Sequence, residues 1–109
     1  MKRAEAGIYK HMRAWRKHVG LTQEQTANIL GVSNTVFSEK ERGVRRFRPE
    51  EIEKLSEIYK EKAWFMIAFA PDDPKLNAFK RAYEILLKMS PEAAEKWMDI
   101  AEILISAQG

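Results

Sequence analysis

Apolar residues along the chain recur at helical spacing, and no stretch alternates in the way that a half-buried strand would. Near the start, one stripe has intervals of four, three and four residues and consists of Ile8, Met12, Trp15 and Val19. This spacing places the four side chains on one face of a helix, and Gly20 is expected to end it. The pattern therefore predicts an amphipathic helix close to the start of the chain.

Two short helices are predicted next, with a very short link between them. Thr22 and Gln25 have the spacing of a capping box, which favours a helix that starts after Thr22 and stops at Gly31. Ser33 is a favourable N-cap for the following helix, which runs to Arg42. Because the link has only about three residues, the two helices must cross steeply, as in a helix-turn-helix.

Prolines mark the starts of the later helices. Pro49 precedes an amphipathic helix that carries Ile52, Leu55 and Tyr59, and the apolar run 64–69 predicts a short fifth helix. Asp73-Pro74 and Ser90-Pro91 each combine a cap with a first-turn proline, so two further helices are expected. We therefore predict an all-α protein, with a helix-turn-helix domain over 1–70 and a C-terminal helical hairpin over 71–109.

Composition and length limit the class of protein. The chain has 109 residues, of which 45% are hydrophobic and 32% are charged, as in a soluble globular domain. The start of the chain has no apolar core typical of a secretion signal, and no apolar stretch approaches the ~20 residues that cross a bilayer. There is no cysteine, which excludes disulfides and thiolate metal sites. These features predict a cytoplasmic protein with no membrane partner.

Charge is distributed unevenly along the chain. Residues 1–62 contain 14 Lys and Arg against 9 Asp and Glu, whereas residues 63–109 contain 5 against 7. A basic first part joined to a slightly acidic second part is compatible with nucleic-acid binding by the first part. The charge distribution by itself does not establish nucleic-acid binding.

Several motifs between Arg13 and Tyr59 together have a specific order. They are Leu21-Thr22-Gln23, the small Ala27, Gly31-Val32-Ser33 and Glu41-Arg42-Gly43. In this combination the segment resembles the phage-repressor type of helix-turn-helix, the XRE family of lambda-like repressors and Cro proteins. The resemblance implies a five-helix lambda-repressor-like domain that binds double-stranded DNA.

Two positions depart from the family pattern, because Thr26 and Lys40 stand where apolar residues are usual. Thr26 is expected to bury its methyl group and to bond its hydroxyl back to the preceding turn. Lys40 is expected to lay its aliphatic stem on the core and to keep its amine outside.

The second helix of the motif presents polar residues on its outward side. Helical geometry turns Phe37, Lys40 and Glu41 inward and leaves an outward set of Asn34, Thr35, Ser38 and Glu39. The resemblance implies that this half of the helix enters the major groove. Asparagine can pair with adenine, threonine offers a hydroxyl and a methyl group, and glutamate accepts from cytosine N4.

Phosphate contacts are expected around the same helix. The candidates are donors at helix starts and an arginine cluster, namely Gln23, Ser33, Arg42, Arg45, Arg46 and Arg48. Lys2, Arg3, Lys10 and Arg13 can extend this basic surface. A structural role is implied for Arg16 and Glu41, because the corresponding residues form an interior salt bridge in some members of the family.

Nothing in the chain indicates an enzyme. His11 and His18 are separated by ~10.5 Å along a helix, too far to share one metal ion directly. No phosphate loop or Ser-His-Asp arrangement is recognisable, and the carboxylates fall beside lysines on amphipathic helices. We therefore expect no catalytic activity, no cofactor and no metal site.

The C-terminal helices have wide apolar faces and little chain to cover them. They either pack on the DNA-binding domain or form a dimer interface, and large aromatic anchors favour the dimer. The predicted interface residues are Trp64, Phe65, Phe79, Tyr83, Trp97 and Leu104. A homodimer would bind an inverted-repeat operator, since one recognition helix reads too few base pairs to find a site in a genome.

Other functions are compatible with the same fold. The favoured interpretation is a transcriptional repressor from a phage or a bacterium. One alternative is the DNA-binding antitoxin of a toxin–antitoxin pair, in which the C-terminal part holds a protein toxin; an antirepressor is another possible protein partner. A second alternative is an adaptor that uses this fold mainly to bind protein.

Overall fold

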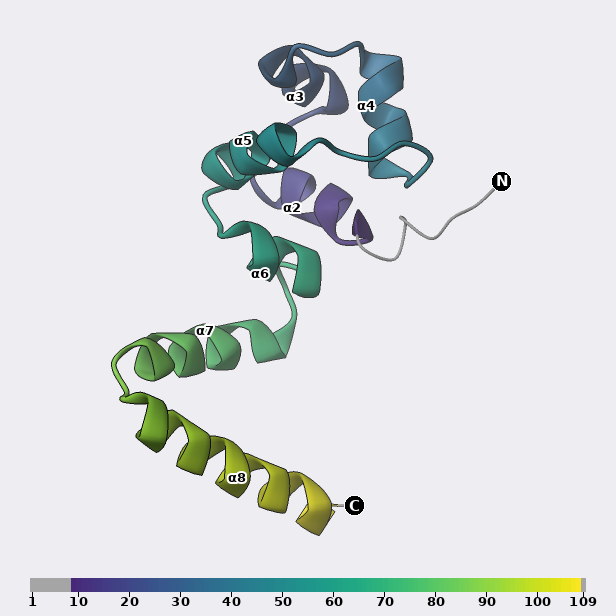
Figure 1. Ribbon diagram of the computed structural model, residues 1–109. Helices are drawn as coiled ribbons and strands as arrows, with labels where there is room; N and C mark the ends of the chain where they lie inside the picture. The colour runs from purple at the N-terminus through teal and green to yellow at the C-terminus, as the bar shows by residue number, and fades with distance from the viewer. Residues whose placement is uncertain (1–8, 109) are drawn as a thin grey trace. The chain divides into compact units, whose positions relative to one another are not determined.

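Every regular element in the part of the chain that the structure describes is an α-helix (Figure 1), so the predicted all-α class is confirmed. The computed structural model describes residues 9–108; Lys2, Arg3 and Ile8, named above, lie outside them. The helices are α2 (Met12–His18), α3 (Gln23–Leu30), α4 (Asn34–Glu41), α5 (Pro49–Tyr59), α6 (Ala63–Ala68), α7 (Pro74–Leu87) and α8 (Pro91–Gln108).

The chain divides into two compact units, and the first ends at Leu76. We expected the division after Ala70. Leu76 is 5% exposed, so the first turn of α7 contributes a side chain to the core of the first unit. The second unit begins at Asn77 and contains the rest of α7 and all of α8.

The core of the first unit is built from one side of each of its helices. Its buried apolar side chains come from α2, α3, α4, α5, α6, the loop before α5 and the start of α7: Met12, Trp15, Ala27, Phe37, Phe47, Leu55, Tyr59, Phe65, Met66 and Leu76. Trp15 also donates its indole N–H to the carbonyl oxygen of Phe69 at 2.8 Å, which fixes α2 to the end of α6. Val19, which the predicted stripe included, is exposed beyond the end of α2.

The α3–turn–α4 segment follows the predicted signals closely. Thr22 and Gln25 form the capping box at the start of α3, with hydrogen bonds of 2.9 and 3.0 Å. Gly31 ends α3 with a φ of 76°, a left-handed conformation that glycine adopts without steric cost. The Ser33 hydroxyl accepts from the Val36 amide at 3.1 Å and caps the start of α4. Helix α4 thus begins only three residues after Gly31. Local hydrogen bonds therefore fix both ends of the turn.

The two unusual polar positions are both buried. The Thr26 hydroxyl donates to the Thr22 carbonyl at 2.9 Å, as expected. The expectation for Lys40 was wrong, because its amine is not outside. Its Nζ donates to both carboxylate oxygens of Glu51 at 2.6 and 2.7 Å, and each of these side chains is 7% exposed. Glu51 lies in the first turn of α5 and brings a carboxylate within reach of Lys40, so the amine is neutralised inside the unit.

The second unit leaves most of its apolar surface uncovered. Asp73 and Ser90 cap α7 and α8, accepting from the amides of Lys75 and Ala93. The tight turn between the helices is as predicted, but α7 and α8 do not pack along their lengths, and α8 has no buried residue over its whole described extent. No helix within residues 9–108 has the length and apolar character that a bilayer span requires.

Candidate nucleic-acid interface

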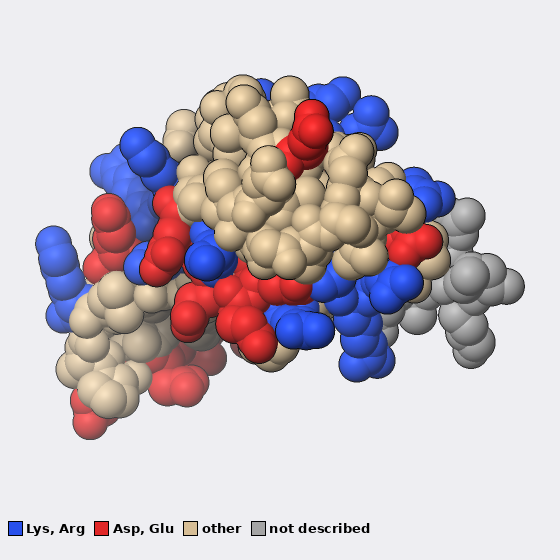
Figure 2. Space-filling view, turned by 90° about the horizontal axis from the view of Figure 1, so that it is seen from above, with Lys and Arg blue, Asp and Glu red and all other residues tan. Residues whose placement is uncertain are grey.

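Helix α4 buries one side and exposes the side that carries the predicted base-reading residues. Asn34 and Thr35 are exposed, and Ser38 and Glu39 are partly exposed. Phe37 is fully buried on the opposite side. Seen from the side of α3 and α4, uncharged residues fill most of the middle of this face, and both basic and acidic residues lie around it (Figure 2). Basic side chains line the hollows on either side of α4. The helix thus offers a polar, largely uncharged strip with basic groups around it.

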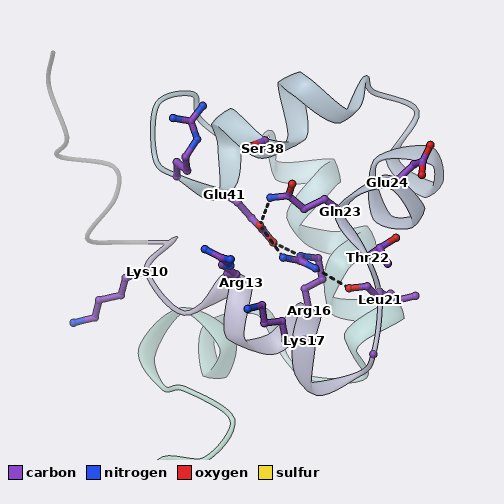
Figure 3. Close-up of a pocket in the computed structure, with 12 residues that line it drawn as sticks. Lys10, Arg13, Arg16, Lys17, Leu21, Thr22, Gln23, Glu24, Ser38 and Glu41 are labelled. Atoms are coloured by element: carbon purple, nitrogen blue, oxygen red, sulfur yellow. Dashed lines mark hydrogen bonds and ion pairs between the residues drawn. The ribbon is translucent and has the colours of Figure 1, made fainter.

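A buried polar network joins α4 to the two preceding helices (Figure 3). Arg16 of α2 donates through Nε to Glu41 Oε2 at 2.7 Å, and Gln23 of α3 donates through Nε2 to Glu41 Oε1 at 3.0 Å. Arg16 also donates to the Leu21 carbonyl at 2.8 Å. The side chains of Arg16 and Glu41 are 7% and 2% exposed. The ion pair that the family resemblance implied is therefore present, and it fixes the orientation of α4.

Sequence reasoning gave Gln23 a phosphate contact and missed its bond to Glu41. The two residues are 18 positions apart, so no local spacing indicates the contact. Gln23 is the first residue of α3, and Figure 3 shows its side chain directed toward Glu41. One side-chain N–H is used by Glu41, and the other donor remains.

Tyr59 of α5 lies buried beside this network. Burial raises the pKa of its hydroxyl, and the negative charge of Glu41 raises it further, against the lowering effect of Arg16. The hydroxyl therefore stays protonated throughout the physiological range. It adds no charge to a region that already contains one ion pair.

A basic hollow, called here the α2–α4 hollow, opens on one side of α4. Its lining combines five cationic side chains with the start of α3 and consists of Lys10, Arg13, Arg16, Lys17, Gly20, Leu21, Thr22, Gln23, Glu24, Ser38, Glu41 and Arg42. In Figure 3, Arg13 and Lys17 project from α2 beside the network. Lys10 and Arg13 were predicted from the sequence to extend the basic surface, whereas Lys17 was not. The 10, 13, 17 spacing of one helical face was the available signal.

A second basic hollow, called the α4–α5 hollow, opens on the other side. It is lined by Val32, Ser33, Val36, Lys40, Arg45, Arg46 and Arg48. At 100° per residue, positions 33, 36 and 40 of α4 lie opposite positions 38, 41 and 42, which line the first hollow. The exposed polar strip of α4, which carries Asn34, Thr35, Ser38 and Glu39, therefore lies between two basic surfaces.

Glu39 and Arg45, which were predicted to have separate roles, form an ion pair. Arg45 Nε donates to Glu39 Oε1 at 2.5 Å, and the side chains are 57% and 27% exposed, respectively. The backbone amides of Val44 and Arg45 also donate to the Glu39 carbonyl, at 2.9 and 3.3 Å. The loop after α4 folds back on the helix end, and this return brings together two residues that lie on different elements.

Glu51, the partner of Lys40, also has a shifted pKa. Burial raises the pKa of its carboxyl, but hydrogen bonds from the Arg48 amide and from the Lys40 ammonium lower it by more. The net result is a pKa below the ordinary value, so Glu51 stays ionised and keeps Lys40 paired. The Lys40 charge that lines the α4–α5 hollow is thus already neutralised, and the arginines supply its positive character.

The residues predicted for a dimer interface do not share one environment. Phe65 is 3% exposed and fills the core of the first unit, which removes it from any interface. The others lie on the surface or are partly exposed: Trp64 (50%), Phe79 (46%), Trp97 (41%), Leu104 (60%) and Tyr83. Within the described residues, no group of three or more His, Asp or Glu side chains is arranged to hold a metal ion.

The comparison with known families agrees with this geometry. The sequence model of a helix-turn-helix domain matches residues 10–62, which contain α2 to α5 with both hollows and the network. The match confirms the resemblance to helix-turn-helix domains of the Cro-like kind. No curated protein and no solved structure matched the chain.

Proposed function

We propose, because residues 10–62 match the model of a helix-turn-helix domain, that the chain is a transcriptional regulator, acting as a repressor, that binds a specific double-stranded DNA site as a homodimer. The observation that carries the proposal is the exposed polar strip of α4, which lies between two basic hollows. A major groove is about 12 Å wide and accepts one α-helix, with a phosphate backbone on either side. The strip and its two basic borders match this arrangement.

Base recognition is assigned to the exposed side of α4. Asn34 and Thr35 lie in its first turn, and Ser38 and Glu39 follow one turn later. The asparagine amide can pair with adenine through two hydrogen bonds, and the serine and threonine hydroxyls can bond several bases. The threonine methyl group can contact thymine, and the glutamate can accept from cytosine N4. The network through Glu41 supports this assignment, since a helix that reads base edges must be held rigidly.

Phosphate contacts are assigned to the two hollows. In the α2–α4 hollow, Arg42, the remaining Gln23 donor and the start of α3 can bind one strand, with Lys10, Arg13 and Lys17 beside them. In the α4–α5 hollow, Arg45, Arg46 and Arg48 can bind the other strand. The Ser33 hydroxyl accepts from the Val36 amide and keeps its own proton to donate to a phosphate oxygen.

Dimerisation is assigned mainly to the second unit. Helix α8 is 18 residues long, has no buried residue and exposes large side chains, among them Trp97, Ile100 and Leu104. Monomeric proteins rarely leave so continuous an apolar surface in water. A two-fold dimer would bind an inverted repeat, with half-site centres ~34 Å apart if both copies of α4 bind on one face of the DNA.

Selection of bound sites from a random pool of double-stranded DNA tests the proposal directly. We expect the intact protein to enrich one inverted repeat and to bind it with an affinity that falls steeply with salt. Enrichment of no sequence at any salt concentration, with the protein shown to be folded, would contradict a sequence-specific function.

A protein partner is the second candidate, because the same exposed apolar face of α8 could hold a toxin or an antirepressor. In that case the protein alone would sediment as a monomer and would acquire specific DNA affinity only in a complex. An adaptor that binds only protein would show no sequence-dependent DNA binding in either state.

A further inference from the structure

The Glu39–Arg45 ion pair connects the recognition strip to the α4–α5 hollow. Glu39 belongs to the outward side of α4, whereas Arg45 lines the hollow beside it. The pair joins the Glu39 Oε1 and Arg45 Nε atoms at 2.5 Å, and more than half of the Arg45 side chain is exposed. One residue assigned to bases and one assigned to phosphates are therefore physically coupled.

The local backbone already brings the two side chains together. The amides of Val44 and Arg45 both donate to the carbonyl oxygen of Glu39, so the loop is held to the end of α4 without the ion pair. An exposed ion pair contributes little to stability. We therefore expect the ion pair to determine the position of the Glu39 carboxylate and to offset its charge. We expect it to have little effect on the stability of the fold.

The carboxylate needs such a partner if it is to approach DNA. An unpaired carboxylate is repelled by the dense negative charge of the phosphates. Arg45 offsets that charge and occupies one oxygen, Oε1, which leaves the other oxygen as an acceptor. A guanidinium has five N–H donors, so Arg45 keeps donors for a phosphate while Nε holds Glu39.

We propose, resting on the proposed function, that Arg45 is a positioning residue for base recognition, which holds the Glu39 carboxylate so that its second oxygen accepts from the N4 amine of a cytosine. Arg45 then couples the recognition of one base pair to a contact with an adjacent phosphate. Its removal changes what the protein prefers at that base pair, and this distinguishes it from a simple phosphate contact, which affects all sequences alike.

The test is a double-mutant cycle on base preference. Affinities are measured for the wild-type selected site and for all single-base changes in it, using Arg45→Ala, Glu39→Gln, the double variant and Arg46→Ala. Arg46 is the matched control, because it is the next residue and lines the same hollow. Thermal unfolding of each variant checks that the fold is unchanged.

We expect Arg45→Ala and Glu39→Gln to lose discrimination at the same cytosine, by roughly 5- to 150-fold. In the Glu39→Gln background, Arg45→Ala should cause no further loss of preference. Arg46→Ala should weaken binding to all sites alike.

Two results would overturn the inference: a uniform loss of affinity in Arg45→Ala with every preference intact, or a change of preference that persists in the Glu39→Gln background. A wild-type protein without any base preference would instead overturn the proposed function, and the inference with it.

Discussion

At the scale of single residues, the inner side of α4 is held by charge as well as by apolar packing. Glu41 pairs with Arg16, and Lys40 pairs with Glu51, so two adjacent positions of one short helix carry buried charges. Both pairs are satisfied by further hydrogen bonds, from Gln23 and from the Arg48 amide. Helix α4 is therefore connected to α2, α3 and α5 by contacts that need defined geometry.

Substitution of Arg16 by Met should strongly destabilise the first unit. It leaves the Glu41 carboxylate, which is 2% exposed, without its guanidinium. Removal of one partner of a buried pair costs ~3–5 kcal/mol, to be measured as the free energy of unfolding in urea. The matched control is Arg13→Met on the exposed side of α2, which should change stability by no more than about 0.5 kcal/mol. Equal small effects of both substitutions would contradict a structural role for the Arg16–Glu41 pair.

Glu51 should make stability depend on pH in the acidic range. Its pKa in the folded protein lies below the ordinary value of 4.5. The carboxylate therefore contributes stability that is fully present above pH 4.5 and is lost as the pH falls from there through the folded pKa. Urea unfolding of the wild type and of Glu51→Gln should show a difference in stability that shrinks as the pH falls below 4.5. A difference that is constant down to pH 3 would contradict this account.

Residue-level prediction succeeded where a position follows from the period of one helix, and the family resemblance supplied the Arg16–Glu41 pair between α2 and α4. It failed for two other contacts that join separate elements. The outward position of Asn34 follows from the 3.6-residue period alone. The burial of Lys40 depends on Glu51, which approaches only after the chain has turned from α4 into α5. The Glu39–Arg45 pair similarly depends on the path of the loop after α4, which the spacing of residues does not encode.

At the scale of elements, helix boundaries were the most predictable feature because local hydrogen bonds set them. Thr22, Ser33, Asp73 and Ser90 all act as the predicted caps. Gly31 turns the chain between α3 and α4, and a Cβ built there would meet no atom within 4 Å, so its backbone conformation, rather than crowding, favours glycine. Each of these signals lies within a few residues of the end that it determines.

The basic side of α2 should contribute to the electrostatic part of DNA binding. Arg13 and Lys17 line the α2–α4 hollow, whereas Arg45, Arg46 and Arg48 line the α4–α5 hollow. Replacement of both by alanine should weaken binding to specific and unrelated DNA alike. The slope of log affinity against log salt should become shallower by ~0.9 for each lost phosphate contact. An unchanged slope would mean that α2 does not reach the backbone.

At the scale of the whole molecule, the sequence indicated two units but not how the second is covered. The wide apolar faces of α7 and α8 were visible as residue patterns, and a packed hairpin was one way to bury them. The structure leaves α8 without a buried residue, so α7 does not cover its apolar face. Amphipathicity indicates that a surface is buried in the functional state, but it does not identify the partner.

Dimerisation should depend on one face of α8. Trp97 and Leu104 share that face with Ala101, at spacings of four and three residues, and Asp99 lies on the opposite side. We expect the wild type to sediment as a dimer at micromolar concentration and the double variant Trp97→Glu/Leu104→Glu to sediment as a folded monomer. Asp99→Ala is the control and should remain dimeric. A wild-type monomer, or a dimer that survives the double substitution, would exclude this face as the interface.

The central claim is that α4 reads base edges in both halves of a symmetric site, and a panel of single-base changes tests it most directly. The affinities of the Asn34→Ala and Thr35→Ala proteins are measured for the selected site and for every version of it with one substituted base pair. Each substitution should remove ~1–3 kcal/mol of discrimination at one base pair and at its symmetry-related partner, with the other preferences unchanged. Preferences that stay the same at every position in both variants, despite a folded protein, would contradict the account.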